Sequence, residues 1–336
     1  MKKSEQIATV LIRLLLLPVT LLLLTSSVMA QDVPEDFVAW LSQLHEDARA
    51  VGISQQTLDL ALSQIEAPLS RVIESDRNQP ELRTTLQNYL ANRVTPQRIA
   101  SGRKMLKRYP TWLGRVEHQF RVQRRFLVAL WGIESNYGRH TGELPVIPAL
   151  VTLAYDQRRA AYFRRELLEA LKILDDGQVS MSRMKGSWAG AMGPFQFMPS
   201  TYRSYAVDAD RDGRINIWGS VPDALASAAH YLAKVGWQDD QTWGRPVKLP
   251  KNFAVDLAGL DKRQPLSRWQ AHGVRRMNGR ALPRRELQAS LILPDGPSGP
   301  AYLVYDNFRV LLQWNRSVSF AIAVGTLADR LAGREF

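Results

Sequence analysis

The carboxyl group of Glu134 is the strongest candidate in this chain for acid–base chemistry. It follows an apolar run that extends from Phe126 to Trp131. On a helix, Leu127, Leu130 and Trp131 lie seven, four and three residues before this carboxyl group and share its face. Such a face partly dehydrates the carboxyl group and raises its pKa, because dehydration disfavours the anion. A carboxylic acid that stays protonated near neutral pH can donate a proton to a glycosidic oxygen. A glutamate that simply faces water near a helix end is the alternative interpretation.

A second candidate site is a loop with alternating acidic residues, typical of the first half of an EF-hand. The residues that would bind a cation through side-chain carboxylates or, at position 7, a backbone carbonyl are Asp208, Asp210, Asp212 and Arg214. Gly213 at position 6 permits the sharp turn. Position 12 is Gly219 in place of the usual bidentate Glu, and Asp223 can supply the closing carboxylate from a longer loop. The spacing indicates a structural calcium site; the alternative is an Asp/Gly-rich surface turn.

The elements that carry these residues belong to a globular chain. It has 336 residues, of which 45% are hydrophobic and 23% charged, a composition that excludes intrinsic disorder as the dominant state. It contains no cysteine. This excludes disulfides, thiolate metal sites, a cysteine nucleophile and a lipid-modified N-terminal cysteine.

Residues 1–30 have the pattern of an export signal. Lys2, Lys3 and Arg13 supply positive charge, Leu14 to Leu24 form an eleven-residue apolar stretch, and Val28 to Ala30 form a small-residue cleavage site before residue 31. The alternative is an uncleaved anchor, but eleven residues are short for the roughly 30 Å of a hydrocarbon core. We therefore expect a periplasmic protein without a stable membrane anchor after cleavage.

The remaining chain is strongly basic. The signal carries three positive charges and one negative, so the formal net charge of +12 becomes +10 for residues 31–336. Such a surface attracts polyanions. An exported protein meets the carboxylates of cell-wall peptides or anionic lipid headgroups, and we expect no nucleic-acid partner. A solvated basic surface with no partner is the alternative.

Hydrophobic periodicity and prolines divide the first half of the chain into helices. Residues 32–110 read as short helical elements punctuated by prolines, and residues 112–175 as longer helices around 114–137 and 157–175. The sequence Asp175-Asp176-Gly177 is expected to end the last of these.

The second half of the chain is more varied. Residues 183–204 form a Gly-rich aromatic loop that leads into a helix and lacks the Gly-Lys-Ser/Thr ending of a phosphate loop. A helix is expected over 222–236. Residues 243–300 are rich in turns, with short β-like runs such as 288–293. Residues 300–332 predict a strand or loop and then a helix from about 317 to 331.

Several ordered motifs closely resemble the lytic murein transglycosylase B family over residues 35–332. In chain order they are Gly132 to Gly138, Asp156 to Arg159, Gly186 to Gly193, Gln196 to Ser200, Asp208 to Trp218, Gly299 to Ala301, Asn307-Phe308 and Trp314-Asn315. The resemblance implies a mainly helical (α+β), lysozyme-like core with an EF-hand-like loop and small accessory lobes. It places a helical lobe at about 31–111, the core at about 112–240 and 300–336, and a turn-rich lobe at about 241–299.

The resemblance also implies an activity and its residues. Family members cleave the β-1,4 bond between N-acetylmuramic acid and N-acetylglucosamine in peptidoglycan without water and leave a 1,6-anhydromuramoyl end. The single catalytic acid/base would be Glu134, and structural Ca²⁺, with no organic cofactor, would be bound by Asp208, Asp210, Asp212, Arg214 and Asp223. The positions that would contact the glycan strand are Arg158, Arg159, Ser187, Gln196, Tyr231 and Asn315. Proteins of cell-wall synthesis are further candidate partners.

One carboxyl group is sufficient for this reaction. It acts first as acid and then as base, and the 6-hydroxyl of the sugar attacks within the same molecule, so the second carboxylate of ordinary glycosidases is not needed. Ser187 and Asn315 can orient the substrate's acetamido group, and Arg158 and Arg159 can meet stem-peptide carboxylates or form a solvated charge pair.

The aromatic residues leave further alternatives. Trp188, Phe195 and Phe197 are expected to be sugar-stacking walls or core residues. Trp314 and Phe320 depart from the family, which often has Tyr at both positions.

Two other functions stay open. A muramidase would use water as the nucleophile with the same acid. An inactive wall-binding scaffold is disfavoured by the presence of Glu134, Ser187 and Gln196.

Overall fold

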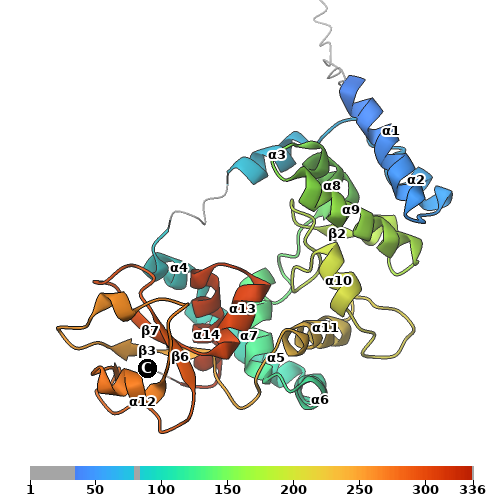
Figure 1. The fold of residues 1–336 in the computed structure, drawn as a ribbon. Coiled ribbons are helices and arrows are strands. Elements are labelled where there is room, and N and C mark those ends of the chain that lie inside the picture. The colour runs from blue at the N-terminus through green and yellow to red at the C-terminus, as the bar shows by residue number, and fades with distance from the viewer. Residues whose placement is uncertain (1–34, 79–83, 335–336) are drawn as a thin grey trace, which may run out of the picture. The chain divides into compact units, whose positions relative to one another are not determined.

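The computed structural model describes residues 35–78 and 84–334. The predicted export signal therefore lies outside the described residues. Among the residues that are described, no helix combines the length and apolar character that a membrane span requires. The chain is mainly helical with a small antiparallel sheet (Figure 1), which confirms the predicted α+β class.

Short helices make up most of the described residues from 35 to 120, as the prolines predict. They are α1 (Glu35–Ala50), α2 (Gln55–Leu62), α3 (Ser70–Arg77), α4 (Leu86–Arg93), α5 (Pro96–Arg108) and α6 (Pro110–Phe120). Pro96 and Pro110 begin their helices because proline fits the first turn, where its missing N–H is not needed. Thr95 caps α5 by accepting a hydrogen bond from the backbone N–H of Arg98.

The single helix predicted around 114–137 is wrong, because α6 ends at Phe120 and α7 (Arg124–Ser135) begins after a break. The break lies at Arg121, whose φ of 59° is left-handed and ends α6. The following Val122 is fully buried. Sequence periodicity misses this break because neither glycine nor proline marks it. The predicted apolar run is confirmed as the buried part of α7, from Phe126 to Ile133.

The middle of the chain contains four helices and a two-stranded ladder. Their bounds are β1 (Leu144–Pro145), α8 (Val146–Tyr155), α9 (Ala160–Asp175), a 3₁₀ turn η2 (Met181–Arg183), β2 (Lys185–Gly186), α10 (Pro199–Tyr205) and α11 (Val221–Lys234). The helices predicted at 157–175 and 222–236 are confirmed as α9 and α11. Helix α8 was not predicted, since its residues are apolar on nearly all sides and show no helical period.

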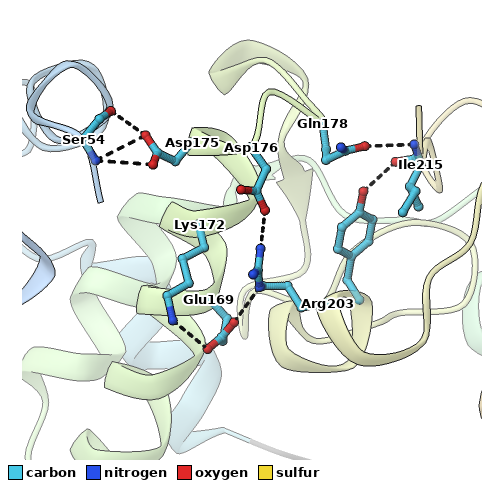
Figure 2. Close-up of polar contacts among 9 residues, drawn as sticks. Ser54, Glu169, Lys172, Asp175, Asp176, Gln178, Arg203 and Ile215 are labelled. Atoms are coloured by element: carbon cyan, nitrogen blue, oxygen red, sulfur yellow. Dashed lines mark hydrogen bonds and ion pairs between the residues drawn. The ribbon is translucent and has the colours of Figure 1, made fainter. Parts of the chain in front are cut away.

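The C-terminal end of α9 joins three segments (Figure 2). Asp175 accepts hydrogen bonds from the hydroxyl and backbone N–H of Ser54, which precedes α2. Arg203 of α10 forms ion pairs with Glu169 and Asp176. Just beyond the helix, Gln178 accepts a hydrogen bond of 3.0 Å from the backbone N–H of Ile215, which anchors the acidic loop.

A five-stranded antiparallel sheet occupies the predicted turn-rich region, with strand order β4-β6-β7-β3-β5. The elements of this region are β3 (Gly244–Lys248), η3 (Val255–Leu257), β4 (Arg263–Pro265), α12 (Leu266–Ala271), β5 (Arg275–Arg276), β6 (Gln288–Ile292) and β7 (Ala301–Val304). The strand predicted at 288–293 is confirmed as β6. One face of the sheet, with Leu291 and Leu303, packs with Trp269 of α12 in a small separate core. The other face, with Ile292 and Tyr302, joins the main core.

Two helices complete the fold, α13 (Asp306–Trp314) and α14 (Val318–Leu331). The predicted C-terminal helix is confirmed as α14, and Ser317 caps it. Helix α13 was not predicted. Helix α14 packs against α7. Its buried Asp329 accepts hydrogen bonds from Arg125 of α7 at 2.6 Å and from the indole of Trp243 at 2.8 Å. These contacts hold α7, and therefore Glu134, in a rigid frame.

Candidate functional site

Glu134 lies in the last turn of α7 and is half-buried. Its Oε1 accepts a hydrogen bond of 2.7 Å from the indole Nε1–H of Trp314, the last residue of α13. Helix α7 stops directly after this turn because Asn136 and Tyr137 are left-handed, with φ of 51° and 62°. The neighbouring hydroxyl of Ser135 donates to the carbonyl of Pro194 at 2.6 Å. The acid is therefore fixed at a helix end beside the Gly-rich aromatic loop.

The indole of Trp314 is held by a cluster of aromatic rings. Its centroid lies 4.9 Å from Tyr231, 5.5 Å from Phe197 and 6.3 Å from Phe195. Tyr231 is itself fixed, since its hydroxyl donates to the carbonyl of Gln313 at 3.0 Å, and burial raises its pKa. These ring contacts hold the indole in the orientation that directs its N–H to Glu134. Sequence reasoning noted Trp314 as a departure from a family pattern and missed this contact, which joins residues 180 positions apart.

The Gly-rich loop is folded tightly next to this cluster. A Cβ on Gly142 would lie 2.1 Å from the backbone of Gly186, so the β1–β2 ladder can form only with glycine there. Ser187 follows this ladder and is half-buried. Its hydroxyl accepts a hydrogen bond of 3.1 Å from the backbone N–H of Ala191, which leaves its own O–H proton available to a ligand.

Gln196 is in a left-handed conformation, with φ of 52°, which is uncommon for a residue with a side chain. Its Nε2 donates to the carbonyls of Thr141 and Gly193, at 3.1 and 2.9 Å. Both acceptors are carbonyl oxygens, so the orientation of the amide is unambiguous. Both amide protons are used, and the Gln196 Oε1 is the atom that can accept from a ligand.

The aromatic residues of the loop were expected to be either sugar-stacking walls or core residues, and burial distinguishes these roles for the two phenylalanines. Phe195 and Phe197 are each 3% exposed and belong to the core, so they support Trp314 rather than form open sugar-stacking walls. Trp188 is half-buried, so its exposure does not decide between the two interpretations. Phe320 is also buried in the core.

Arg158 and Arg159 lie between α8 and α9 and share one carboxylate, that of Asp76 from α3. The Arg158 Nε lies 3.4 Å from Asp76, and an Arg159 NH group donates to the same side chain. Asp76 is only 5% exposed. The pair is therefore tied to a buried acid, an arrangement that sequence reasoning missed because Asp76 lies some eighty residues away in the chain. Both guanidinium groups stay partly exposed.

Asn315 ends α13 next to Trp314 and is exposed. Its Oδ1 accepts a hydrogen bond of 3.0 Å from the backbone N–H of Ser317. The structure thus groups three predicted residues with Glu134 around Trp314. Tyr231 contacts the Trp314 ring, Asn315 follows Trp314 in the chain, and Gln196 lies between Phe195 and Phe197, which both contact that ring. The described ion pairs of Arg158 and Arg159 go instead to Asp76.

The acidic loop gathers three carboxylates at one point. Oxygen atoms of Asp208, Asp210 and Asp212 lie within 4.8 Å of one another. Asp208 accepts backbone N–H groups from Arg211 at 2.6 Å and Gly213 at 2.9 Å. Carboxylates so close repel one another unless a cation lies between them. Side-chain oxygens at positions 1, 3 and 5 match the donor set that Ca²⁺ prefers, so these residues fit the ion.

The rest of the loop is shaped by hydrogen bonds. Asp212 accepts the backbone N–H of Arg214 at 2.8 Å. The fully buried Asp223 accepts the N–H groups of Ala209 and Asn216, both at 2.8 Å, and burial raises its pKa. The side-chain carboxylate of Asp223 thus closes the loop by accepting backbone N–H groups at its two ends. Its predicted role as an ion ligand, and that of the Arg214 carbonyl, stay predictions.

Comparison with known proteins gives consistent matches. Residues 36–329 match the family described as "Transglycosylase SLT domain". The membrane-bound lytic murein transglycosylase B of Escherichia coli (strain K12) is 34% identical over 253 residues, which cover 71% of this chain and 65% of that protein. The match thus spans slightly less than two thirds of that relative.

Solved structures agree with these matches. SltB3 from Pseudomonas aeruginosa in complex with NAG-anhNAM-pentapeptide is 46% identical, with a TM-score of 0.86 over 90% of this chain and 80% of that one. The Escherichia coli lytic transglycosylase Slt35 in complex with calcium is 30% identical, with a TM-score of 0.75 over 87% of this chain and 92% of that one.

Proposed function

Because the chain belongs to the transglycosylase SLT domain family, as its motifs predict, we propose that it is a lytic transglycosylase, a lyase of peptidoglycan. Its lysozyme-like fold is that of the solved relatives. The bond cleaved is the β-1,4 bond between N-acetylmuramic acid and N-acetylglucosamine, and the product carries a 1,6-anhydromuramoyl end. The single observation that carries this proposal is the half-buried Glu134, which is oriented by the N–H of Trp314 at 2.7 Å.

Glu134 acts twice in the proposed reaction. As the bond to the leaving oxygen breaks, the carboxylic acid gives its proton to that oxygen. The carboxylate then takes the proton of the sugar's 6-hydroxyl while this oxygen bonds to the anomeric carbon, which returns Glu134 to its acid form. The indole N–H of Trp314 stabilises the carboxylate between these two steps.

The neighbouring polar groups bind and orient the glycan. The free O–H proton of Ser187 and the side-chain amide of Asn315 are suited to the acetamido group. The Oε1 of Gln196 accepts a sugar hydroxyl, and Tyr231 supports the wall formed by Trp314. Arg158 and Arg159 meet carboxylates of the stem peptide at the edge of the site, held in place by Asp76.

We further propose that the acidic loop binds Ca²⁺ through Asp208, Asp210 and Asp212, with the Arg214 carbonyl and Asp223 completing the site. The bound ion would neutralise the clustered carboxylates and rigidify the loop. This role is structural, because the loop is anchored to Gln178 and to Asp223 of α11.

We place the protein in the periplasm, where its polymer substrate lies, after cleavage of residues 1–30. We also propose the division predicted from the resemblance, with a helical lobe at about 31–111, a core at about 112–240 and 300–336, and a turn-rich lobe at about 241–299.

The test is a digest of purified sacculi by Glu134→Gln protein and by a control variant, Glu143→Gln. Glu143 is nine positions away, is 85% exposed and pairs only with Lys185 at 3.7 Å within the described residues. We expect the parent and the control to release muropeptides lighter by one water than hydrolysis products. The Glu134→Gln protein should bind sacculi and release none. Products with ordinary reducing ends would show a muramidase, and near-parental turnover by Glu134→Gln would refute the assignment.

A further inference from the structure

The positive charge of the protein is concentrated in the segment 241–299, which contains β3 to β6 and α12. This segment has eleven Lys and Arg residues and four Asp and Glu residues, a net charge of +7. The whole of residues 31–336 has a net charge of +10. About a fifth of the chain therefore carries most of the charge that attracts polyanions.

Much of this charge is not neutralised within the protein. Arg263 and Arg285 form ion pairs with Asp306 and Asp240. Lys262 donates to the backbone carbonyl of Asp256. The exposed cations of this segment whose side chains form neither an ion pair nor a hydrogen bond with any described residue are Lys248, Lys251, Arg268, Arg280 and Arg284. We call these five residues the basic surface. Cations left without partners on one small segment repel one another, and binding an anion relieves this repulsion.

A hollow lies within the same segment, between α12 and the chain from 282 to 288. Its volume is about 920 Å³. Its polar lining comes from Ser267, Gln270, Arg284, Arg285, Glu286 and Gln288. Proline and leucine side chains supply the apolar part of the wall. A hollow with guanidinium, amide and apolar groups suits a peptide that carries carboxylates, because the guanidinium fork matches a carboxylate.

We propose that this segment is a second contact site for peptidoglycan, which binds stem-peptide carboxylates through the basic surface and the adjoining hollow. The inference rests on the proposed function, since it assumes that the polymer is the substrate. The site differs from the one around Glu134. Trp269, Leu266 and Val247 beneath it belong to the small core, whereas α7 belongs to the main core.

A peptide polymer fits this segment better than a lipid surface does. Helices and loops that insert into membranes present aromatic and long aliphatic side chains to the lipid. Here Trp243 and Trp269 are fully buried, and the exposed large apolar residues of the segment are the separate Val255 and Met277. Binding through such a surface would hold the enzyme on the wall between cleavage events.

The test compares two five-residue variants in the Glu134→Gln background. One replaces the basic surface residues with Gln. The matched control replaces five exposed basic residues of other segments with Gln, namely Arg71, Lys104, Lys107, Arg108 and Lys234. Both variants lose the same charge. Binding to purified sacculi is measured by co-sedimentation at low and high salt, and melting curves check that both variants are folded.

We expect the basic-surface variant to bind sacculi roughly tenfold more weakly than the parent, as five surface ion contacts of modest strength imply. Added salt should weaken the binding of this variant less than it weakens the binding of the parent. The control should bind like the parent. Sacculi with amidated carboxylates should bind the parent and the basic-surface variant alike. Equal binding of the two variants to native sacculi would overturn the proposal, and so would tighter binding of the parent to phosphatidylglycerol vesicles than to sacculi.

Turnover separates this inference from the proposed function. With Glu134 intact, the basic-surface variant should cleave soluble muropeptide oligomers at the parental rate while it clears intact sacculi more slowly. A parent protein that cleaves sacculi, together with a basic-surface variant that clears them equally fast, would refute the second site and leave the proposed function standing. A parent that cleaves neither substrate would refute the proposed function itself.

Discussion

Replacing Trp314 with Phe removes the hydrogen bond to Glu134 and keeps an aromatic ring in the cluster. The indole Nε1–H is a donor only, and it contacts Glu134 Oε1 at 2.7 Å. The ring of Phe can still pack against Tyr231, Phe195 and Phe197. The substitution therefore tests the N–H group rather than the packing.

The size of the effect follows from the charge of the acceptor. A hydrogen bond to a charged group contributes roughly 1.5–3 kcal/mol, about twice as much as one between neutral groups. The indole thus stabilises the carboxylate over the acid by about 1–1.5 kcal/mol. About 1.4 kcal/mol corresponds to one pKa unit. Loss of the indole hydrogen bond should therefore let Glu134 stay protonated up to a pH about one unit higher.

The assay is the pH dependence of kcat/KM on a soluble muropeptide oligomer. The reaction begins with Glu134 protonated, so activity is lost as pH rises through its ionisation. In Trp314→Phe this alkaline limb should move to higher pH by about one unit. Trp314→Tyr, which supplies an O–H donor, should recover part of the difference.

Trp112→Phe is the matched control, since Trp112 lies half-buried in α6 and its ring faces the guanidinium of Arg115. Its profile should match that of the parent. A purely structural role for Trp314 would lower the rate at every pH without moving the limb. If the profiles of Trp314→Phe and the parent superimpose after scaling, the reasoning about this hydrogen bond is wrong.

Three further outcomes are expected. Calcium at 100 times its Kd should stabilise the fold by about 2.7 kcal/mol, and Asp208→Asn should lose this calcium-dependent rise in Tm; a metal-free parent whose Tm does not respond to calcium would exclude the site. Asp76→Asn should lower the free energy of unfolding by about 1–3 kcal/mol, seen as a lower Tm, and should raise KM for substrates with stem peptides more than for those without. Unchanged KM values for both kinds of substrate would show that the arginine pair does not bind the stem peptide. Hydrogen bonds from Ser54 and Thr57 lower the pKa of Asp175, so its stabilising contribution is present above its ordinary pKa and is lost as pH falls through the lower native value. Asp175→Asn should therefore be less stable than the parent at pH 7 and equal to it in acid, as urea titrations at several pH values can check; a difference that persists in acid would contradict this.

Contiguous features were accessible from the sequence because local patterns encode them. The apolar run before Glu134 predicts a buried helix that ends in a half-buried carboxyl group, and α7 has this form. The spacing from Asp208 to Gly213 predicts a loop that gathers carboxylates, and the three carboxylates do converge. The helix predicted from about 317 to 331 is α14, which begins directly after its capping residue, Ser317.

Features without a local signal were missed or misplaced. The break at Arg121 depends on a left-handed residue that is not glycine, so no composition rule marks it. Helix α8 has apolar residues on nearly all sides and shows no period. The burial of Phe195 and Phe197 decided between core and stacking wall, and the type of residue alone left that choice open.

The sequence by itself determined which groups are available for chemistry: one acid after an apolar helix, an acidic loop, and a basic, turn-rich segment. The tertiary structure decided which groups meet. Trp314 reaches Glu134 across 180 residues, and Asp76 reaches Arg159 across 83. Such contacts depend on how helices pack, and packing is set by the whole core rather than by the residues near each partner in the chain.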